Sequence, residues 1–372
     1  MITIAKNTPT YFLISAGTLT TKRFIFCLAF LIFITLQPSF KLFVEVYAQP
    51  ADAFKPFTVV VLPDTQGYLH WIEPDKKRVF QSQIEWIQDH ALDKNILMVL
   101  HLGDIVMTNN MQEWKGAKEL FQSLDNWIPY VLTIGNHDAS PNTHCRGTEF
   151  FNLFFPVKHF INQKYFGGVF EQEKLDNAFY FFKGGMTDYL VIALEFAPRD
   201  EALEWANKII ENYPNHKVFI ITHAYLGPND IRLTGGEPFN LHYDQTITTQ
   251  PYWTFNDGEE IWEKLVRRHK NVQFVLSGHV LSDGVGRNIS RGDNGNNVFQ
   301  IVSNYQFLAN GGNGYMRIME FYPKTNKLQI KTYSPYLDYY KTDKQNEFVI
   351  DLSKGLYQND LLSNFYYQDV LE

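Results

Sequence analysis

Short apolar runs alternate with amphipathic stretches through the first part of the chain. The run at 57–62 (Phe-Thr-Val-Val-Val-Leu) is too short and too rich in β-branched residues for a helix, which favours a buried strand. Similar runs lie at 96–102 and 128–134, and the stretches between them, at about 76–90 and 112–124, have the spacing of amphipathic helices. This β-α-β-α-β order predicts a parallel sheet with right-handed connections.

The pattern resumes after a long interruption. Residues 139–178 show few regular signals, and residues 224–256 form a second long connection that contains Gly and Pro. Long segments of this kind are usually lids or binding loops. Between and after them we expect strands at 189–196, 217–222 and 272–277 and helices at 202–213 and 259–269.

The pattern changes towards the carboxyl terminus. The sequence Pro323-Lys324-Thr325-Asn326 lies between two strand-like runs and predicts a hairpin. We therefore expect a second, more antiparallel sheet that closes one domain over 55–345, while the tail at 346–372 is left unassigned. Its strands are expected at 297–303, 315–321 and 328–333.

Residues 1–48 resemble an export signal peptide. Lys22 and Arg23 precede an apolar run at 24–36, which is too short to span a bilayer. The small residue Ala48 favours cleavage directly after it, so we expect a periplasmic or secreted protein without a stable membrane span once the leader is removed. The alternative is an uncleaved leader that anchors the protein to a membrane.

The net charge and the cysteine content limit the expected partners and the expected sources of stability. The net charge of −7 argues against a general nucleic-acid-binding protein, which would usually present a basic face, so no nucleic-acid partner is expected. Of the two cysteines, Cys27 lies in the leader and Cys145 in a long loop. One remaining cysteine cannot form an internal disulfide, so stability has to come from the core and from any bound metal.

Five predicted strands end in a residue that can bind a metal. These residues are Asp64, Asp104, Asn136, His223 and His279. Each one taken alone is more simply a turn or surface residue. Parallel strands, however, bring their carboxyl ends to one edge of a sheet, where ligands bind, so we expect the five side chains to converge. Carboxylate, amide oxygen and imidazole are the ligands of a hard to borderline divalent ion.

The motifs around these residues resemble those of the calcineurin-like metallophosphoesterases over residues 57–335. The family pattern is Asp-x-His, Gly-Asp-x-x, Gly-Asn-His-Asp or Glu, a lone His, and Gly-His-x-His. The counterparts are Asp64-Thr65-Gln66, Gly103-Asp104-Ile105-Val106, Gly135-Asn136-His137-Asp138, Thr222-His223-Ala224 and Gly278-His279-Val280-Leu281. The resemblance implies an α/β fold, a four-layer α/β/β/α sandwich of the metallo-dependent phosphatase type.

The resemblance also implies two divalent ions, drawn from Mn²⁺, Zn²⁺, Fe and Mg²⁺. By position in the motifs, Asp104 would bridge the two ions. One ion would be held by Asn136, His223 and His279, and the other by Asp64 and the amide oxygen of Gln66.

Two departures from the family pattern fall on the same metal site. Gln66 stands where the family usually has His, and Leu281 stands where the last His belongs. A site with fewer nitrogen ligands should prefer a harder ion, bind it more weakly or stay empty. Asp283 is either a replacement ligand or a turn residue. Both departures resemble an exported bacterial branch of the family.

The implied activity is hydrolysis of phosphomonoesters or small phosphodiesters by water that the metal ions activate. His137 would not bind metal but would assist as a general acid or charge stabiliser, with Asp138 orienting its ring. The alternative is a non-catalytic, exported metal-binding protein that keeps one intact metal site.

Three residues in the long loops are candidates for binding a small phosphorylated substrate. Arg146 and His144 lie eight to ten residues beyond Asn136, and His242 lies in the second long loop. Positive groups near the phosphate would stabilise transition-state charge. The alternative for each is an ordinary solvent-exposed loop residue.

Overall fold

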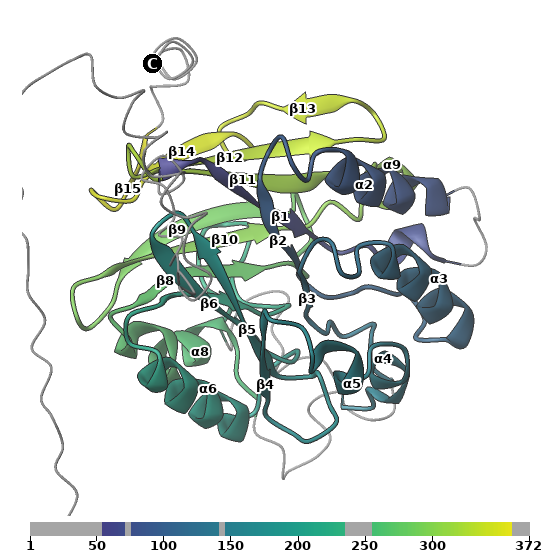
Figure 1. Cartoon of the computed structure of the whole chain (residues 1–372), viewed down its shortest axis with the longest axis horizontal. Coiled ribbons are helices and arrows are strands. Elements are labelled where there is room, and N and C mark those ends of the chain that lie inside the picture. The colour runs from purple at the N-terminus through teal and green to yellow at the C-terminus, as the bar shows by residue number, and fades with distance from the viewer. Residues whose placement is uncertain (1–53, 71–75, 141–145, 235–254, 359–372) are drawn as a thin grey trace, which may run out of the picture. The chain divides into compact units, whose positions relative to one another are not determined.

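The computed structural model describes residues 54–70, 76–140, 146–234 and 255–358. In this part of the chain, two mixed β-sheets pack face to face, and helices cover their outer faces (Figure 1). The arrangement confirms the α/β class and is consistent with the expected four-layer sandwich. Residues 1–48, the expected leader, lie outside the described residues, as does Cys145.

The first sheet has the order β15-β14-β12-β11-β1-β2-β3, with β13 paired to β12. Its parallel half confirms the predicted β-α-β-α-β unit, in which amphipathic helices connect neighbouring strands. The elements of this half are β1 (Phe57–Leu62), α2 (Lys77–Asp89), β2 (Ile96–His101), α3 (Met111–Gln122) and β3 (Tyr130–Leu132).

The last strands of the chain extend this first sheet, which corrects the expectation of a separate antiparallel sheet. β11 pairs antiparallel with β1, so that Phe321 lies opposite Phe57. The predicted hairpin is confirmed, with Tyr322 opposite Lys327, and the unassigned tail supplies two further strands. The strands are β11 (Met316–Tyr322), β12 (Lys327–Ser334), β13 (Tyr339–Lys341), β14 (Phe348–Asp351) and β15 (Leu356–Gln358).

The second sheet has the order β4-β5-β6-β7-β8-β10-β9. Its central strands β6, β7, β8 and β10 run parallel, and α6 and α8 connect the first three. The elements are β4 (Phe166–Val169), β5 (Ala178–Gly184), β6 (Thr187–Ala193), α6 (Asp200–Asn212), β7 (Lys217–Ile221), α8 (Gly258–Lys264), β8 (Val272–Ser277), β9 (Val285–Arg291) and β10 (Asn297–Ser303).

The first long segment contains more regular structure than its sequence indicates. It includes the short helices α4 (Glu149–Phe154) and α5 (Val157–Phe160) as well as strand β4. Phe151 and Phe155 are buried against Trp114 of α3, so this aromatic patch is part of the core. Three short helices complete the inventory of the described residues: η2 (Gln66–Tyr68), η6 (Val266–Arg268) and α9 (Ala309–Gly312).

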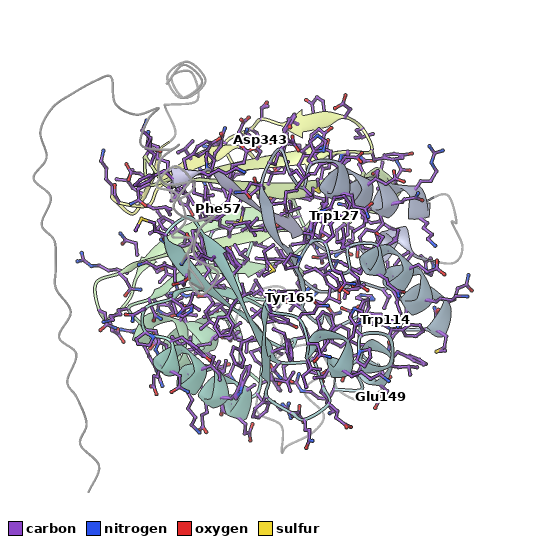
Figure 2. The ribbon with its side chains drawn as sticks, viewed as in Figure 1. Phe57, Trp114, Trp127, Glu149, Tyr165 and Asp343 are labelled. Carbon is purple, nitrogen blue, oxygen red and sulfur yellow. The ribbon has the colours of Figure 1, made fainter. Side chains whose placement is uncertain are left out.

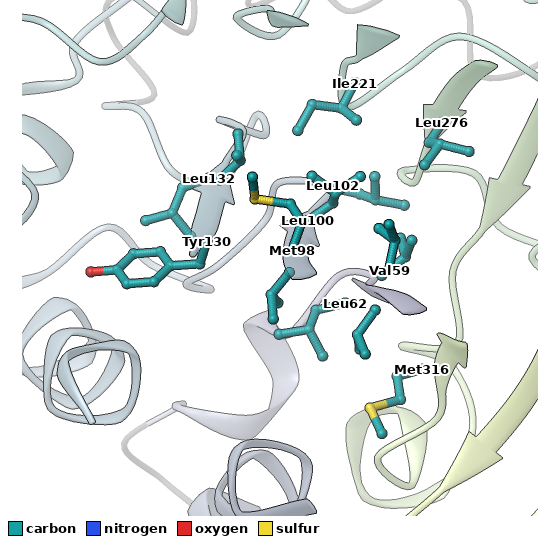
Figure 3. Packing of buried hydrophobic residues seen from close by; sticks show 14 of the residues in the cluster. Val59, Leu62, Met98, Leu100, Leu102, Tyr130, Leu132, Ile221, Leu276 and Met316 are labelled. Carbon is teal, nitrogen blue, oxygen red and sulfur yellow. The ribbon is translucent and has the colours of Figure 1, made fainter. Parts of the chain in front are cut away.

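Aromatic side chains join the two sheets. Phe57 of β1 stacks on Phe321 with ring centroids 4.6 Å apart, and it also lies 5.9 Å from Tyr189 of β6 in the opposite sheet. Figure 2 shows the side chains filling the space between the sheets. Nearer the site, Leu102 faces Ile221 and Leu276 of the second sheet (Figure 3). Among the described residues, no helix combines the length and apolar character that crossing a membrane requires.

Candidate metal centre

The five strand-end residues come from two sheets, not from one sheet edge as expected. Asp64, Asp104 and Asn136 follow β1, β2 and β3 of the first sheet, whereas His223 and His279 follow β7 and β8 of the second. The loops of the two sheets bond directly: His223 Nδ1 lies 2.8 Å from Leu102 O, and His279 N lies 3.1 Å from Asp64 Oδ2. The site is therefore built where the two sheets meet.

Asp104, His223 and His279 form a cluster that could hold a metal ion. One ligand atom from each lies within 4.8 Å of the others. His223 donates its Nδ1 proton to Leu102 O, which turns Nε2 towards Asp104, 3.2 Å from Oδ2. Within the described residues Nε2 has no hydrogen bond of acceptable geometry, although it is buried. In the neutral ring the Nε2 lone pair faces this carboxylate, so a cation between the two could take the place of the proton.

The charges around Asp104 depend strongly on one another. Burial alone would raise the pKa of Asp104, but His223 outweighs it and lowers that pKa to about 2. Burial would likewise lower the pKa of His223, but Asp104 and Asp64 raise it to about 9. Burial raises the pKa of Asp64 to about 8, with His223 opposing the shift and Asp104 adding to it. Two buried carboxylates whose charges repel each other favour a bound divalent cation.

Glycines make room for the two carboxylates. A Cβ atom on Gly135 would lie 2.1 Å from Asp104 Oδ1, and one on Gly278 would lie 2.2 Å from Asp64 Oδ1. Asp104 and His279 themselves have positive φ angles of 51° and 69°, which are uncommon for residues with a side chain. Such conformations cost energy and cluster at functional sites.

Gln66 stands where the family pattern has an imidazole, on the side of Asp104 expected to bind metal more weakly. The Gln66 side chain is buried, and its Oε1 has no hydrogen-bond partner among the described residues, so this oxygen is available to a cation. Asp283 is exposed and its carboxylate accepts a 3.4 Å hydrogen bond from Val285 N. This contact fits a turn residue, the second of the two interpretations of Asp283.

His137 is oriented by the backbone, which corrects the role expected for Asp138. The ring Nδ1 lies 2.7 Å from Met107 O, and the backbone N–H of His137 donates to Asp104 Oδ1 at 2.9 Å. Because the carbonyl requires a donor, the proton is on Nδ1 and Nε2 is left for other contacts. The Asp138 carboxylate instead accepts hydrogen bonds from the N–H groups of Gly135, Ile105 and Val106.

Glu113 holds the backbone that orients His137. It lies in the first turn of α3, and its buried carboxylate accepts from Met107 N at 2.8 Å and Thr108 N at 2.9 Å. The Asn110 side chain caps the same helix and fixes its start. Sequence reasoning missed Glu113 because an acidic residue in a first helical turn is common and reveals nothing about a distant loop.

His101 connects two of the motif loops and was also missed. Its Nδ1 accepts from Gly103 N at 3.1 Å, so Nε2 carries the proton and donates to Thr65 Oγ1 at 2.9 Å. Burial, helped by His223, lowers the pKa of His101 to about 3, which keeps the ring neutral. The contact ties the loop after β1 to the loop after β2.

Arg146 is used inside the protein, which corrects its expected role at the substrate. Its two terminal nitrogens donate to Phe196 O and Ala197 O, both at 2.6 Å. The Phe196 ring in turn packs near His223 and His279, with centroids 5.7 and 5.4 Å away. Arg146 therefore supports one wall of the site. The other two candidates, His144 and His242, lie outside the described residues.

Together these features fit divalent metal ions. The donor set combines buried carboxylates with imidazoles, two of its buried polar atoms lack a hydrogen bond among the described residues, and glycines leave the surrounding space open. The structure brings Asp104, His223 and His279 together, bonds Asp64 to the His279 backbone and puts His137 beside Asp104, while Asn136 follows Gly135, which packs on the Asp104 carboxylate.

Comparisons with known proteins agree with this description. A family model for the calcineurin-like phosphoesterases matches residues 57–283. The chain is 28% identical over 310 residues to YvnB of Bacillus subtilis (strain 168), which is described as uncharacterized. The match covers 80% of this chain, but the chain spans only 22% of the length of YvnB.

Two solved structures match the chain at low similarity. The NAD nucleotidase NadN of Haemophilus influenzae has 11% identity and a TM-score of 0.40, and the match covers 82% of this chain and 53% of NadN. GAP50, the anchor in the inner membrane complex of Plasmodium, has 11% identity and a TM-score of 0.41, covering 78% of this chain and 89% of GAP50. Similarity this low says nothing about the activity of the chain.

Proposed function

Because the chain belongs to the calcineurin-like phosphoesterase family, we propose that it is a metal-dependent hydrolase of phosphomonoesters or small phosphodiesters. The observation that supports this most directly is the cluster of Asp104, His223 and His279, whose ligand atoms lie within 4.8 Å of one another. His137 holds no metal in this proposal, and its backbone N–H donates a hydrogen bond to Asp104 of that cluster.

Two ion-binding groups share Asp104 in this proposal. Asn136, His223 and His279 complete the first group, and Asp64 and Gln66 complete the second. Bound divalent ions, among Mn²⁺, Zn²⁺, Fe and Mg²⁺, would supply Lewis acidity and activate water. The second group has only oxygen donors, so it should prefer a harder ion and bind it more weakly.

His137 has the geometry of a proton-holding residue. Its Nδ1 proton is committed to Met107 O, so Nε2 is the ring atom that can meet a phosphate or leaving-group oxygen. A protonated Nε2 would stabilise negative charge or donate a proton to the leaving group. Asp138 contributes indirectly, since it fixes the loop of residues 104–106 against Gly135.

The experiment is to load the protein with Mn²⁺, Zn²⁺ or Fe and to measure turnover of aryl phosphates and aryl phosphodiesters. We expect His137→Ala to lower kcat about 100-fold or more while bound metal is retained, because general acid–base catalysis typically contributes 10²–10⁴-fold. His159→Ala is the control, since His159 pairs with Asp125 elsewhere in the described chain. Absence of turnover with every metal, together with no effect of His137→Ala, would contradict the proposal.

The second candidate function is metal binding without catalysis. It is favoured by the absence of an imidazole on the Asp64 side, where Gln66 and Leu281 stand. Counting metal per chain by elemental analysis separates the two functions. Close to two ions with turnover supports the hydrolase, whereas one ion without turnover supports the binding protein.

We also propose that the protein is exported, on the basis of the composition of residues 22–48. Cell fractionation and determination of the mature amino terminus would test this. A mature chain that begins directly after Ala48 is the expected result. A chain that retains the apolar run and sediments with membranes would support the anchored alternative.

A further inference from the structure

A loop beside the metal centre carries the chain from the second sheet to the first. This crossover loop, residues 304–315, connects β10 with β11. β10 is the direct neighbour of β8, which ends just before His279, and β11 is the direct neighbour of β1, which ends just before Asp64. The crossover loop therefore begins and ends one strand away from two residues of the metal centre.

The strand registers place both ends of the crossover loop level with these residues. The parallel register of β10 and β8, continued by two residues, puts Asn304 level with His279. The antiparallel register of β1 and β11, continued by three residues, puts Gly314 level with Asp64. Because neighbouring strands lie about 4.8 Å apart, the crossover loop flanks the site on the side where the second ion group is proposed.

The loop after β1 holds the crossover loop in this place. Gly314 N donates to the Tyr68 hydroxyl at 3.0 Å. The backbones of Gly311 and Gly67 approach so closely that a Cβ atom on Gly67 would lie 2.9 Å from Gly311 Cα. Gly67 directly follows Gln66 in the sequence, so the crossover loop packs against the neighbours of a proposed metal ligand.

The crossover loop has a fixed and costly backbone conformation. Asn304 N donates to Gly284 O at 2.7 Å, and Asn304 Oδ1 accepts from Gln306 N at 2.9 Å. Residues 310–314 all have positive φ angles, from 51° to 124°, although two of them are asparagines. Such conformations cost energy and cluster at functional sites, so we looked for a function of this loop in its exposed side chains.

The outer turn of the crossover loop exposes two large apolar side chains. Phe307 is 64% exposed and Leu308 is 39% exposed. Tyr336 and Leu337, which follow β12, are exposed as well, and a Cβ atom on Gly314 would lie 3.2 Å from Tyr336 Cβ. Apolar side chains that are exposed together mark a binding surface, whereas scattered single ones do not.

We propose that Phe307 is a specificity-determining residue that stacks on an aromatic ring in the organic group of the phosphate ester. The inference rests on the proposed hydrolase function and names its substrate class, which is esters with an aromatic ring close to the phosphate. A phosphate held at the strand ends would leave this group over the rim of the site, where the crossover loop presents Phe307. A phenylalanine ring stacks at low entropic cost, since only two side-chain torsions are fixed.

The first test measures binding and requires no turnover. Metal-loaded protein is titrated calorimetrically with phenylphosphonate and with methylphosphonate, which have no hydrolysable ester bond and differ in the ring. We expect phenylphosphonate to bind about 5-fold more tightly or better, as stacked aromatic pairs do. Phe307→Ala should remove this preference and Phe307→Tyr should keep it. Met186→Ala is the matched control, because Met186 is an exposed apolar residue in the turn before β6, at the other end of the second sheet.

The second test measures turnover of phenyl phosphate and methyl phosphate. Phe307→Ala should lower kcat/KM about 5-fold or more for the phenyl ester, mainly through KM, and leave the methyl ester and Tm unchanged. Equal affinities for the two phosphonates, no binding of either one, or a preference that survives Phe307→Ala would overturn the inference even in an active enzyme. Absence of turnover would instead count against the hydrolase, and the phosphonate titrations would still decide whether Phe307 binds the ring.

Discussion

His137 shows how a single side chain can depend on a residue that never touches it. The ring is held by Met107 O, and the Met107 backbone is held by the Glu113 carboxylate. Glu113 is therefore a positioning residue, since it acts through the backbone of residues 107 and 108. The motif Gly-Asn-His-Asp identifies His137, but a backbone carbonyl has no sequence signal, and for that reason Asp138 was the wrong choice for its partner.

The role of Glu113 can be tested by truncating its side chain. Glu113→Ala should lower kcat about 10- to 100-fold without loss of bound metal, because small misplacement of a catalytic group is costly. Glu113→Gln keeps an oxygen for the Met107 and Thr108 N–H groups and should restore most of the rate. Steady-state kinetics with metal analysis provides the measurement.

A double-mutant cycle distinguishes positioning of His137 from general destabilisation. In the His137→Ala background, Glu113→Ala should have almost no further effect on kcat. Glu119→Ala on the same helix is the control, because Glu119 is paired with Lys77 at the surface. Equal losses of rate in both backgrounds would mean that Glu113 does not act through His137.

At the scale of the elements, the segment that follows β6 forms one wall of the site. It contains a buried carboxylate, that of Glu195, which pairs with two arginines. Glu195 accepts a 2.8 Å hydrogen bond from Arg199 Nε and lies 3.9 Å from a terminal nitrogen of Arg146. Burial alone would raise the pKa of Glu195, but Arg146 and Arg199 outweigh it and lower the pKa below its ordinary value of 4.5. Arg146 therefore holds the Phe196 segment, and Arg146 and Arg199 together favour the ionised form of Glu195.

The lowered pKa predicts a defined pH dependence of stability. Ionised Glu195 stabilises the fold fully above its unfolded pKa near 4.5, and this stabilisation is lost as pH falls through the lower folded pKa. Glu195→Gln should cost about 3 kcal/mol at pH 7, as for other broken buried pairs, and progressively less towards pH 3. Urea unfolding at several pH values measures the difference.

The control is Asp188→Asn, because the Asp188–Lys183 pair is exposed and should contribute little at any pH. A deficit in Glu195→Gln that stays constant between pH 7 and pH 3 would show that its charge is not the cause.

The predicted elements with a clear period were confirmed, and those without one were not anticipated. The runs at 57–62, 96–102 and 272–277 correspond to β1, β2 and β8 almost residue for residue. β5 was missed because its sequence, Ala-Phe-Tyr-Phe-Phe-Lys-Gly, follows a long irregular stretch and shows no alternation. The charged and polar residues of β9 likewise conceal a strand at the edge of a sheet.

At the scale of the whole molecule, the sequence pattern predicts the α/β class but not which sheet each strand joins. β11 and β12 carry an ordinary antiparallel pattern, and nothing local indicates that β11 pairs with β1, more than 250 residues earlier. Register between distant strands is determined by packing of both faces, which a linear pattern does not contain. The predicted boundary at residue 345 suffers from the same limitation.

Truncation can test where the domain ends. Removing everything after Gln345 deletes β14, in which Phe348, Val349 and Ile350 are buried. Loss of three such side chains should cost roughly 5 kcal/mol or more, comparable with the total stability of many domains. We expect this variant to be largely unfolded or insoluble. Urea titration and solubility assays provide the measurements.

A chain that ends after Gln358 is the matched control and should stay folded, since it keeps β14 and β15. If the two truncated proteins unfold at the same urea concentration as the full chain, the last strands do not belong to the stable unit.

The meeting of two sheets at the metal centre has a consequence for the time at which the site forms. His279 bonds to Asp64 across 215 residues of chain, and His223 bonds to Leu102 across 121. Contacts of such long range form late, because the entropy of closing the intervening chain must first be overcome. A chain with only one sheet in place has only part of this set of residues. The complete metal-binding cluster should therefore arise in the last step of folding, and a chain that is still being synthesised would not yet contain it.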